Sequence, residues 1–233
     1  MKNPFFKFKH YQPKKREIPL DNILRSKGLI MERLVDGYNK LLEEEVRGLV
    51  WLVEHSRLVK AYAKAEELIK DIEFTQYDIE EFCSQLENSD KIRYSIAGPA
   101  GIYISALCNH AKEKEITLNL DTGGREIHLI GYRLKEGKRI QIEGNVGDFT
   151  GVGLCGGEII VQGSCRNWTG AGMRSGKILV KKDVGYYTGE WMRGGEIWVE
   201  GRIKDIGKVV NGKIYAGGNL VYPNPDTPYR YRT

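Results

Sequence analysis

Hydrophobic positions recur every nineteen residues through the second half of the chain. The segment that begins at Ile140 divides into three complete units and a shortened fourth, and each unit starts with a short apolar run. The units read IQIEGNVGDFTGVGLCGGE, IIVQGSCRNWTGAGMRSGK, ILVKKDVGYYTGEWMRGGE and IWVEGRIKDIGKVVNGK. An internal period of about 20 residues is typical of solenoids, in which equivalent residues of successive coils lie above one another.

Alignment of the units produces four apolar columns, and we expect these columns to form the interior. Their members are Ile140, Ile159, Ile178, Ile197 and Ile214; Ile142, Val161, Val180, Val199 and Ala216; Val146, Cys165, Val184 and Ile203; and Leu154, Met173, Met192 and Val209. The first two columns are two residues apart, which places both on one face of a strand. Because glycine corners separate the short apolar runs, residues 139–221 predict a right-handed parallel β-helix with about nineteen residues per coil.

One outward-facing column of this β-helix is unexpectedly apolar. Its members are Gln141, Ile160, Leu179, Trp198 and Tyr215. Four of these five side chains are apolar on a face that would otherwise meet solvent, so we expect something to cover them. The helical N-terminal region is the expected cover, and a partner protein is the alternative.

A second ladder of residues predicts stacked rings. It runs through Phe149, Trp168 and Tyr187 and continues at Ile206. Aromatic stacking at the spacing between strands stabilises stacked sheets, although such a ladder also suits sugars or bases.

Basic residues provide the candidate contacts to an anionic partner. Arg174 and Arg193 occupy one column of the repeats, and solvated arginines are the alternative interpretation. Residues 1–19 hold six basic residues and one acidic residue, so the net charge of +5 comes from this segment and the rest of the chain is balanced. We expect an extended arm in which Lys14, Lys15 and Arg16 meet nucleic acid or another anion, or whose phenylalanines pack on protein.

Residues 20–90 predict a helical region. Apolar residues follow steps of three and four from Leu20 to Asp71, which indicates one long helix or two with a break near Gly48 or Ser56. Thr75 and Asp78 form a capping pair at the start of a further short helix.

Residues 91–138 predict a small α/β adapter, so the expected fold class is α+β. Its strands are KIRYSIAG, EITLNL and REIHLIG, and its helix is IYISALCNHAKEK. The turn at Gly98 is interpreted as a plain strand-to-helix turn, with anion binding as the alternative. We expect the adapter strands to cap one end of the β-helix, and the last strand with the proline-rich tail 222–233 to close the other.

Three segments of the repeats read GDFTGVGLCGGEIIVQG, WTGAGMRSGKILV and YYTGEWMRGGEIWVEG. They resemble the GXGXG-motif β-helix family. That family comprises the C-terminal domain of the large glutamate synthase subunit and the β-helical subunit of formylmethanofuran dehydrogenase. The resemblance covers roughly residues 139–221, and the cadence is closer to the formylmethanofuran dehydrogenase type. It implies a scaffold that lies beside redox or amidotransfer subunits and has no active site of its own.

Composition narrows the function classes further. The four cysteines lack CxxC spacing and are expected to be reduced, and no apolar run approaches a signal peptide or a membrane span, so we expect a cytoplasmic protein. Ser105, Cys108 and His110 share one predicted helix, but His110 points away from the other two and a nucleophilic site is not expected. We predict no catalytic residues, cofactor or metal.

The leading hypothesis is a non-catalytic scaffold or assembly subunit that binds protein subunits of a larger complex or forms a homo-oligomer. One alternative is an enzyme with a site between the helical region and the β-helix. The other is a nucleic-acid-associated protein that uses the basic arm.

Overall fold

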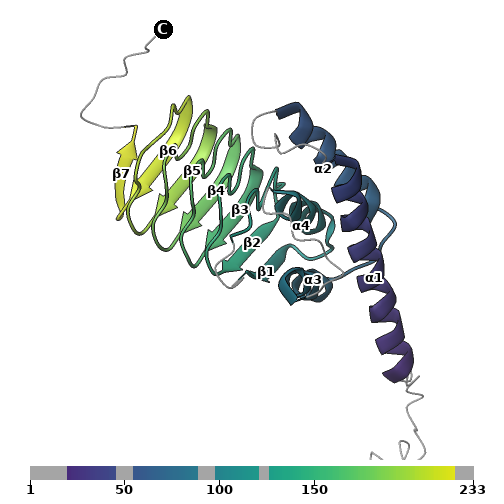
Figure 1. Ribbon diagram of the computed structural model, residues 1–233. Helices are drawn as coiled ribbons and strands as arrows, with labels where there is room; N and C mark the ends of the chain where they lie inside the picture. The colour runs from purple at the N-terminus through teal and green to yellow at the C-terminus, as the bar shows by residue number, and fades with distance from the viewer. Residues whose placement is uncertain (1–19, 46–54, 89–97, 121–125, 224–233) are drawn as a thin grey trace, which may run out of the picture.

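The computed structural model describes residues 20–45, 55–88, 98–120 and 126–223 of the chain. Helices gather at one end of an elongated, sheet-walled solenoid (Figure 1). The helices are α1 (Leu20–Glu45), α2 (His55–Ile69), α3 (Gln76–Asn88) and α4 (Pro99–His110). The strands are β1 (Glu115–Asn119), β2 (Arg139–Glu143), β3 (Cys155–Val161), β4 (Ser175–Val180), β5 (Arg193–Val199), β6 (Asn211–Ala216) and β7 (Asn219–Tyr222).

The solenoid is a parallel β-helix of about four turns, as the repeats predict. Its strands form one sheet in chain order, with every neighbouring pair from β1 to β6 parallel. A second wall comes from single parallel bridges that link Val146 to Cys165, Cys165 to Val184 and Val184 to Ile203. Each coil therefore contributes to both walls, and equivalent residues lie directly above one another.

The predicted apolar columns form the interior of the solenoid. Val161, Val180 and Val199 pair in register through β3, β4 and β5, and all three are buried. The isoleucine column that begins at Ile140 is wholly buried as well. In the last described coil Val209 remains partly exposed, because no other coil of the described residues lies over it.

The first coil lies outside the nineteen-residue period and was missed as a repeat. Strand β1 confirms the strand predicted at EITLNL, but it pairs in register with β2, so Ile116 lies beside Ile140. The strand predicted at REIHLIG is wrong, because its described residues form a corner of this coil. Leu129 adopts a φ of 64°, matching 62° at Phe149 in the next coil. Paired β1 and β2 residues are 24 positions apart, as in Glu115 with Arg139, so the uniform spacing is lost.

The adapter strand β1 covers the edge of β2, as expected, and helix α4 closes the end of the solenoid beyond it. The adapter strand predicted at KIRYSIAG lies outside the described residues up to Gly98. In the inner coils, the backbone N–H of Arg174 donates to the Leu154 carbonyl of the preceding coil at 2.9 Å. Lys135 occupies the same position in the first coil, and its N–H donates to Asn109 Oδ1 at 3.0 Å. Asn109 Nδ2 also donates to the Arg133 carbonyl at 3.3 Å. A side-chain amide thus replaces the missing coil.

Ser105 makes a second closing contact from the same helix. Its hydroxyl accepts a hydrogen bond from the N–H of Tyr132 at 3.1 Å, and it lies 2.6 Å from the Gly101 carbonyl within α4. Gly101 sits so close to the coil that a Cβ atom would clash with the His128 carbonyl oxygen. The polar residues of α4 therefore serve the backbone of the first coil.

The other helices pack behind α4 and confirm the helical region. Two helices, α1 and α2, are present in place of one long helix. Of the two expected break points, Ser56 lies inside α2 and Gly48 lies outside the described residues. The predicted capping pair is present, since the Asp78 carboxylate accepts hydrogen bonds from both the N–H and the hydroxyl of Thr75 at 2.8 Å. Tyr38, Phe82 and Tyr103 form an aromatic cluster between α1, α3 and α4.

Strand β7 turns back against β6 and covers part of the C-terminal end. The two strands are antiparallel, and the Tyr222 hydroxyl reaches over the end of the core to donate to the Val209 carbonyl at 3.0 Å. This confirms the predicted closure by the last strand, while residues 224–233 lie outside the described part of the chain.

Substitution of Asn109 tests the closure by α4. We expect Asn109→Ala to lower the free energy of unfolding by about 2 kcal/mol, because an amide N–H and a carbonyl lose their partner. Thermal unfolding followed by circular dichroism measures this as a fall of roughly 4–8 °C. Asn219→Ala, at an exposed position, serves as the control and should change little. Equal stability of the two variants would contradict the closing role.

Two glycines of one corner provide a matched test of interior packing. Gly170 and Gly172 have φ values of 70° and 62°, so alanine costs about 1 kcal/mol at either position. A Cβ at Gly170 would lie 2.5 Å from Ile197 Cδ1, whereas none of the described atoms lies within 4 Å of a Cβ at Gly172. We expect Gly170→Ala to lose about 1–3 kcal/mol more than Gly172→Ala in urea unfolding. Similar losses would indicate a loosely packed interior.

Candidate functional site

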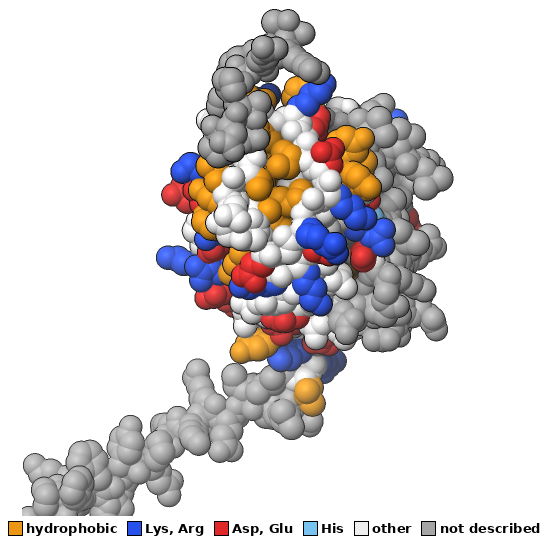
Figure 2. Space-filling model, turned by 90° about the vertical axis from the view of Figure 1, so that its left-hand side faces the viewer, with side chains coloured by type: hydrophobic (Ala, Val, Ile, Leu, Met, Phe, Trp, Pro, Cys, Tyr) orange, Lys and Arg blue, Asp and Glu red, His pale blue; other side chains and the backbone are white. Residues whose placement is uncertain are grey.

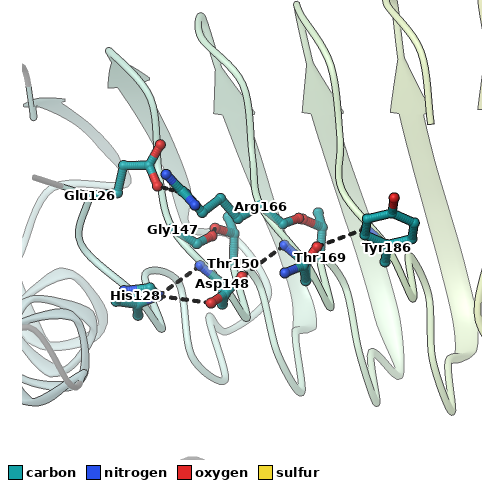
Figure 3. Close-up of polar contacts among 9 residues, drawn as sticks. Glu126, His128, Gly147, Asp148, Thr150, Arg166, Thr169 and Tyr186 are labelled. Carbon is teal, nitrogen blue, oxygen red and sulfur yellow. Dashed lines mark hydrogen bonds and ion pairs between the residues drawn. The ribbon is translucent and has the colours of Figure 1, made fainter. Parts of the chain in front are cut away.

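A polar ladder at one corner of the coils is the first candidate site (Figure 3). His128, Asp148 and Asn167 occupy equivalent positions in successive coils. The side chain of each accepts a hydrogen bond from the backbone N–H of the next coil, in every case at 2.9 Å. The corner ladder, as we call these three residues, therefore joins one coil to the next.

The corner ladder also carries charge. His128 Nδ1 lies 3.5 Å from Asp148 Oδ2, and Arg166 forms an ion pair with Glu126 beside them. His128 Nδ1 accepts the Asp148 N–H, so this ring nitrogen is already engaged between the two coils. The histidine and the aspartate thus resemble an acid–base pair, but their polar atoms are engaged in coil-to-coil contacts.

Sequence reasoning missed the corner ladder because its members differ chemically from coil to coil. A histidine, an aspartate and an asparagine share the ability to accept a hydrogen bond, and no common residue type marks the column. Alignment of LIGYRLKEG with FTGVGLCGG at a spacing of twenty would have placed His128 on the Asp148 column.

The predicted aromatic ladder is confirmed through Tyr187. Its continuation at Ile206 is wrong, because Ile206 pairs with Thr188 of the preceding coil instead of Tyr187. Ring centroids of Phe149 and Trp168 lie 4.9 Å apart with planes 3° from parallel, and those of Trp168 and Tyr187 lie 5.2 Å apart at 10°. All three residues adopt φ values between 57° and 62°, a left-handed conformation that side chains other than glycine seldom take. Phe149 and Trp168 are half-buried, whereas Tyr187 is 46% exposed.

The outward apolar ladder lies in register on the outer face of strands β2 to β6. Its members pair in the order Gln141, Ile160, Leu179, Trp198 and Tyr215. Rings of Trp198 and Tyr215 stack with centroids 3.7 Å apart, and Lys177 Nζ lies 5.2 Å from the Trp198 ring. All five side chains are half-buried.

The expected cover of this ladder by the helical region is wrong for the described helices. Helices α1 to α4 lie beyond the β1 end of the solenoid, with α3 against β1, rather than along the outer face of β3 to β6 (Figure 1). Helix α4 closes the end of the solenoid and the other helices pack behind it. None of these described helices therefore lies along the outer face.

The basic candidates divide into two groups. Arg174 and Arg193 are exposed on neighbouring coils, and neither forms an ion pair with a carboxylate in the described part of the chain. Like charges on adjacent rungs repel, so an anionic partner at this pair stays a prediction, with solvated arginines as the alternative. Lys14, Lys15 and Arg16 lie outside the described residues.

The residues of α4 that suggest nucleophilic chemistry do not form a site. Ser105 bonds to the backbone of the first coil, while His110 Nε2 lies 3.2 Å from Glu66 Oε1 on α2. Burial raises the pKa of the Cys108 thiol to about 12. At the helix start, Pro99 is buried and Gly98 has a φ of 96°, in agreement with a plain turn into the helix.

Metal-ligand geometry, membrane-spanning helices and comparisons with known proteins do not extend the description of this site. Among the described residues, no group of three or more His, Cys, Asp or Glu side chains is arranged to hold a metal ion. No helix in the described ranges combines the length and the apolar character needed to cross a bilayer. Comparisons with protein-family models, curated proteins and solved structures find no match to the chain. The fold therefore defines a parallel β-solenoid protein closed at one end by helices.

Thiol reactivity tests the assignment of the cysteines to the interior. Burial raises the pKa of Cys165 to about 12, as it does for Cys108, and it also raises the pKa of Cys83. Because the thiolate is the reactive form, these three thiols should react very slowly at pH 8. Cys155 is half-exposed.

A disulfide reagent at pH 8 should therefore titrate one fast thiol in the native protein and all four after denaturation. Cys155→Ser should remove the fast phase. Two or more fast thiols in the native wild type would contradict the buried positions.

Proposed function

We propose that this protein is a non-catalytic scaffold subunit, and that the outer face of its solenoid docks onto another protein. The carrying observation is the outward apolar ladder, in which Ile160, Leu179, Trp198 and Tyr215 form a continuous half-buried stripe that the described helices leave uncovered. Apolar stripes of this kind mark interaction surfaces, and stacked Trp and Tyr rings are typical anchors of protein interfaces.

The side chains that could act in catalysis are engaged in structural contacts, which supports a role without catalysis. His128 and Asp148 are engaged between coils, His110 is paired with Glu66, and Ser105 is bonded to backbone. Helix α4 packs tightly against the first coil, as the close approach of Gly101 illustrates. This packing argues against an enzyme site between the helical region and the solenoid.

The resemblance to the GXGXG-motif β-helix family extends this proposal. It favours partners of the redox or amidotransfer type, as subunits of a larger complex, with a homo-oligomer as the alternative. A right-handed winding, the sense adopted by nearly all parallel crossovers, and a cytoplasmic location belong to the same proposal.

Substitution within the ladder tests docking. We expect the chain, isolated under native conditions from the cells that produce it, to elute in an assembly larger than its own 26.5 kDa. Leu179→Glu should release it as a free chain, because a charge in the apolar stripe would have to be desolvated on docking. Light scattering coupled to size-exclusion chromatography measures the mass.

Two further variants keep this test specific. Leu179→Thr, which retains the preference for a strand, should weaken the assembly while leaving thermal unfolding close to that of the wild type. Lys182→Glu changes charge at an exposed position outside the ladder and should leave the assembly intact. A wild-type chain of 26.5 kDa, or an assembly indifferent to Leu179→Glu, would refute the proposal.

A further inference from the structure

The third complete coil departs from its own repeat at Trp191. The equivalent residues of the two preceding coils are Gly153 and Gly172, and all three adopt φ values between 57° and 64°. Glycine takes this left-handed conformation without cost, whereas an ordinary side chain is disfavoured by about 1–2 kcal/mol. The indole of Trp191 is nevertheless 57% exposed, so its packing explains little of its presence.

Tyr186 departs from the repeat in the same corner. It follows His128, Asp148 and Asn167 in the corner ladder, but a phenol stands where those residues accept a backbone hydrogen bond. Its side chain is 49% exposed. One corner of this coil thus carries three exposed rings, those of Tyr186, Tyr187 and Trp191. The turn at this corner is closed by a hydrogen bond of 3.1 Å from the Glu190 N–H to the Tyr187 carbonyl.

Two ammonium groups that form no ion pair with a described carboxylate accompany these rings, while the Lys208 backbone N–H donates to Glu190 Oε2. Lys204 Nζ lies 5.4 Å from the centre of the Tyr186 ring, and Lys208 Nζ lies 5.9 Å from that of Trp191. Elsewhere on the described solenoid many cations are paired with carboxylates, namely Lys135, Arg139, Arg166, Lys181, Arg202 and Lys213. Figure 2, which faces the C-terminal end of the solenoid, shows hydrophobic and basic side chains next to one another.

We propose that the corner formed by Tyr186, Tyr187 and Trp191 binds single-stranded nucleic acid. Unpaired bases stack on the exposed rings, and the phosphates between them pair with Lys204 and Lys208. Arg174 and Arg193 extend the positive charge, since Arg193 is two residues from Trp191 and Arg174 lies one coil below. Exposed aromatic rings beside free cations are the combination by which proteins hold unpaired strands.

The chemistry favours this ligand over two others. A neutral sugar would stack on rings but would leave the two lysines without a role. An acidic protein segment would pair with the lysines but has no general need for three exposed rings on the same corner. The site is independent of the outward apolar ladder, which lies on the sheet strands, so the two proposals can fail separately.

Fluorescence anisotropy of the full chain with labelled twelve-nucleotide oligouridylate and oligothymidylate tests the proposal. We expect binding of both strands, and the comparison distinguishes RNA from DNA as the preferred source. Trp191→Gly introduces the residue of the two preceding coils, so the thermal midpoint should stay within about 3 °C. The same variant should weaken binding about tenfold, as loss of one stacking ring does. Trp191→Phe, which keeps a ring, should retain most of the affinity.

Charge variants separate this corner from the rest of the chain. Lys204→Gln and Lys208→Gln should each reduce the slope of log Kd against log salt concentration by about 0.7, the value for one phosphate of a single strand. Lys181→Gln, a cation on another side of the coil, should leave the slope unchanged.

Three results would overturn the proposal. The first is absence of binding to either oligonucleotide at low salt. The second is binding that survives Trp191→Gly but is lost when Lys14, Lys15 and Arg16 are changed to Gln, which would assign binding to the arm. The third is equally tight binding of polyglutamate that Trp191→Gly does not weaken, which would reveal a cationic patch suited to acidic proteins.

Discussion

Hydrogen bonding from one coil to the next is the interaction on which the molecule depends. A coil of about nineteen residues cannot enclose its own side chains, and its backbone N–H groups point along the solenoid toward a neighbour. Backbone bonds from each coil to the adjacent one satisfy these groups, and the in-register apolar columns fill the space between the walls. Register and burial are therefore two consequences of a single stacking geometry.

A stack of this kind must be closed at its ends, and the two ends are closed by different means. At the first coil, Asn109 and Ser105 of α4 supply the hydrogen-bonding groups that a preceding coil would have supplied. At the last coil, β7 folds back in the antiparallel sense and Tyr222 bonds to Val209. The helical region thus closes the end of the solenoid at the first coil. Because its described helices lie there, they leave the outer face of the sheet uncovered.

The left-handed corners determine which side chains the solenoid can display. Every coil bends through residues with positive φ, and most of these positions are glycine. Where an aromatic residue occupies such a corner, stacking on the equivalent ring of the next coil offsets part of the conformational cost, as between Phe149 and Trp168. Trp191 lacks an equivalent ring in the preceding coil, and that contrast supports the ligand-binding role that we propose for it.

The repeat alone determined the solenoid, its four apolar columns and its two outward ladders, because a stack converts sequence spacing directly into position in space. Only the tertiary structure decided how the ends are closed, where the helices lie and that one more coil precedes the repeats. These features depend on hydrogen bonds between residues that the nineteen-residue repeat does not relate. Examples are the bonds from the Lys135 N–H to Asn109 and from the Asp148 N–H to His128, in which one partner is a backbone group and no residue type identifies it. These long-range side-chain bonds leave no pattern in the sequence, because almost any residue offers the backbone N–H and carbonyl that they use.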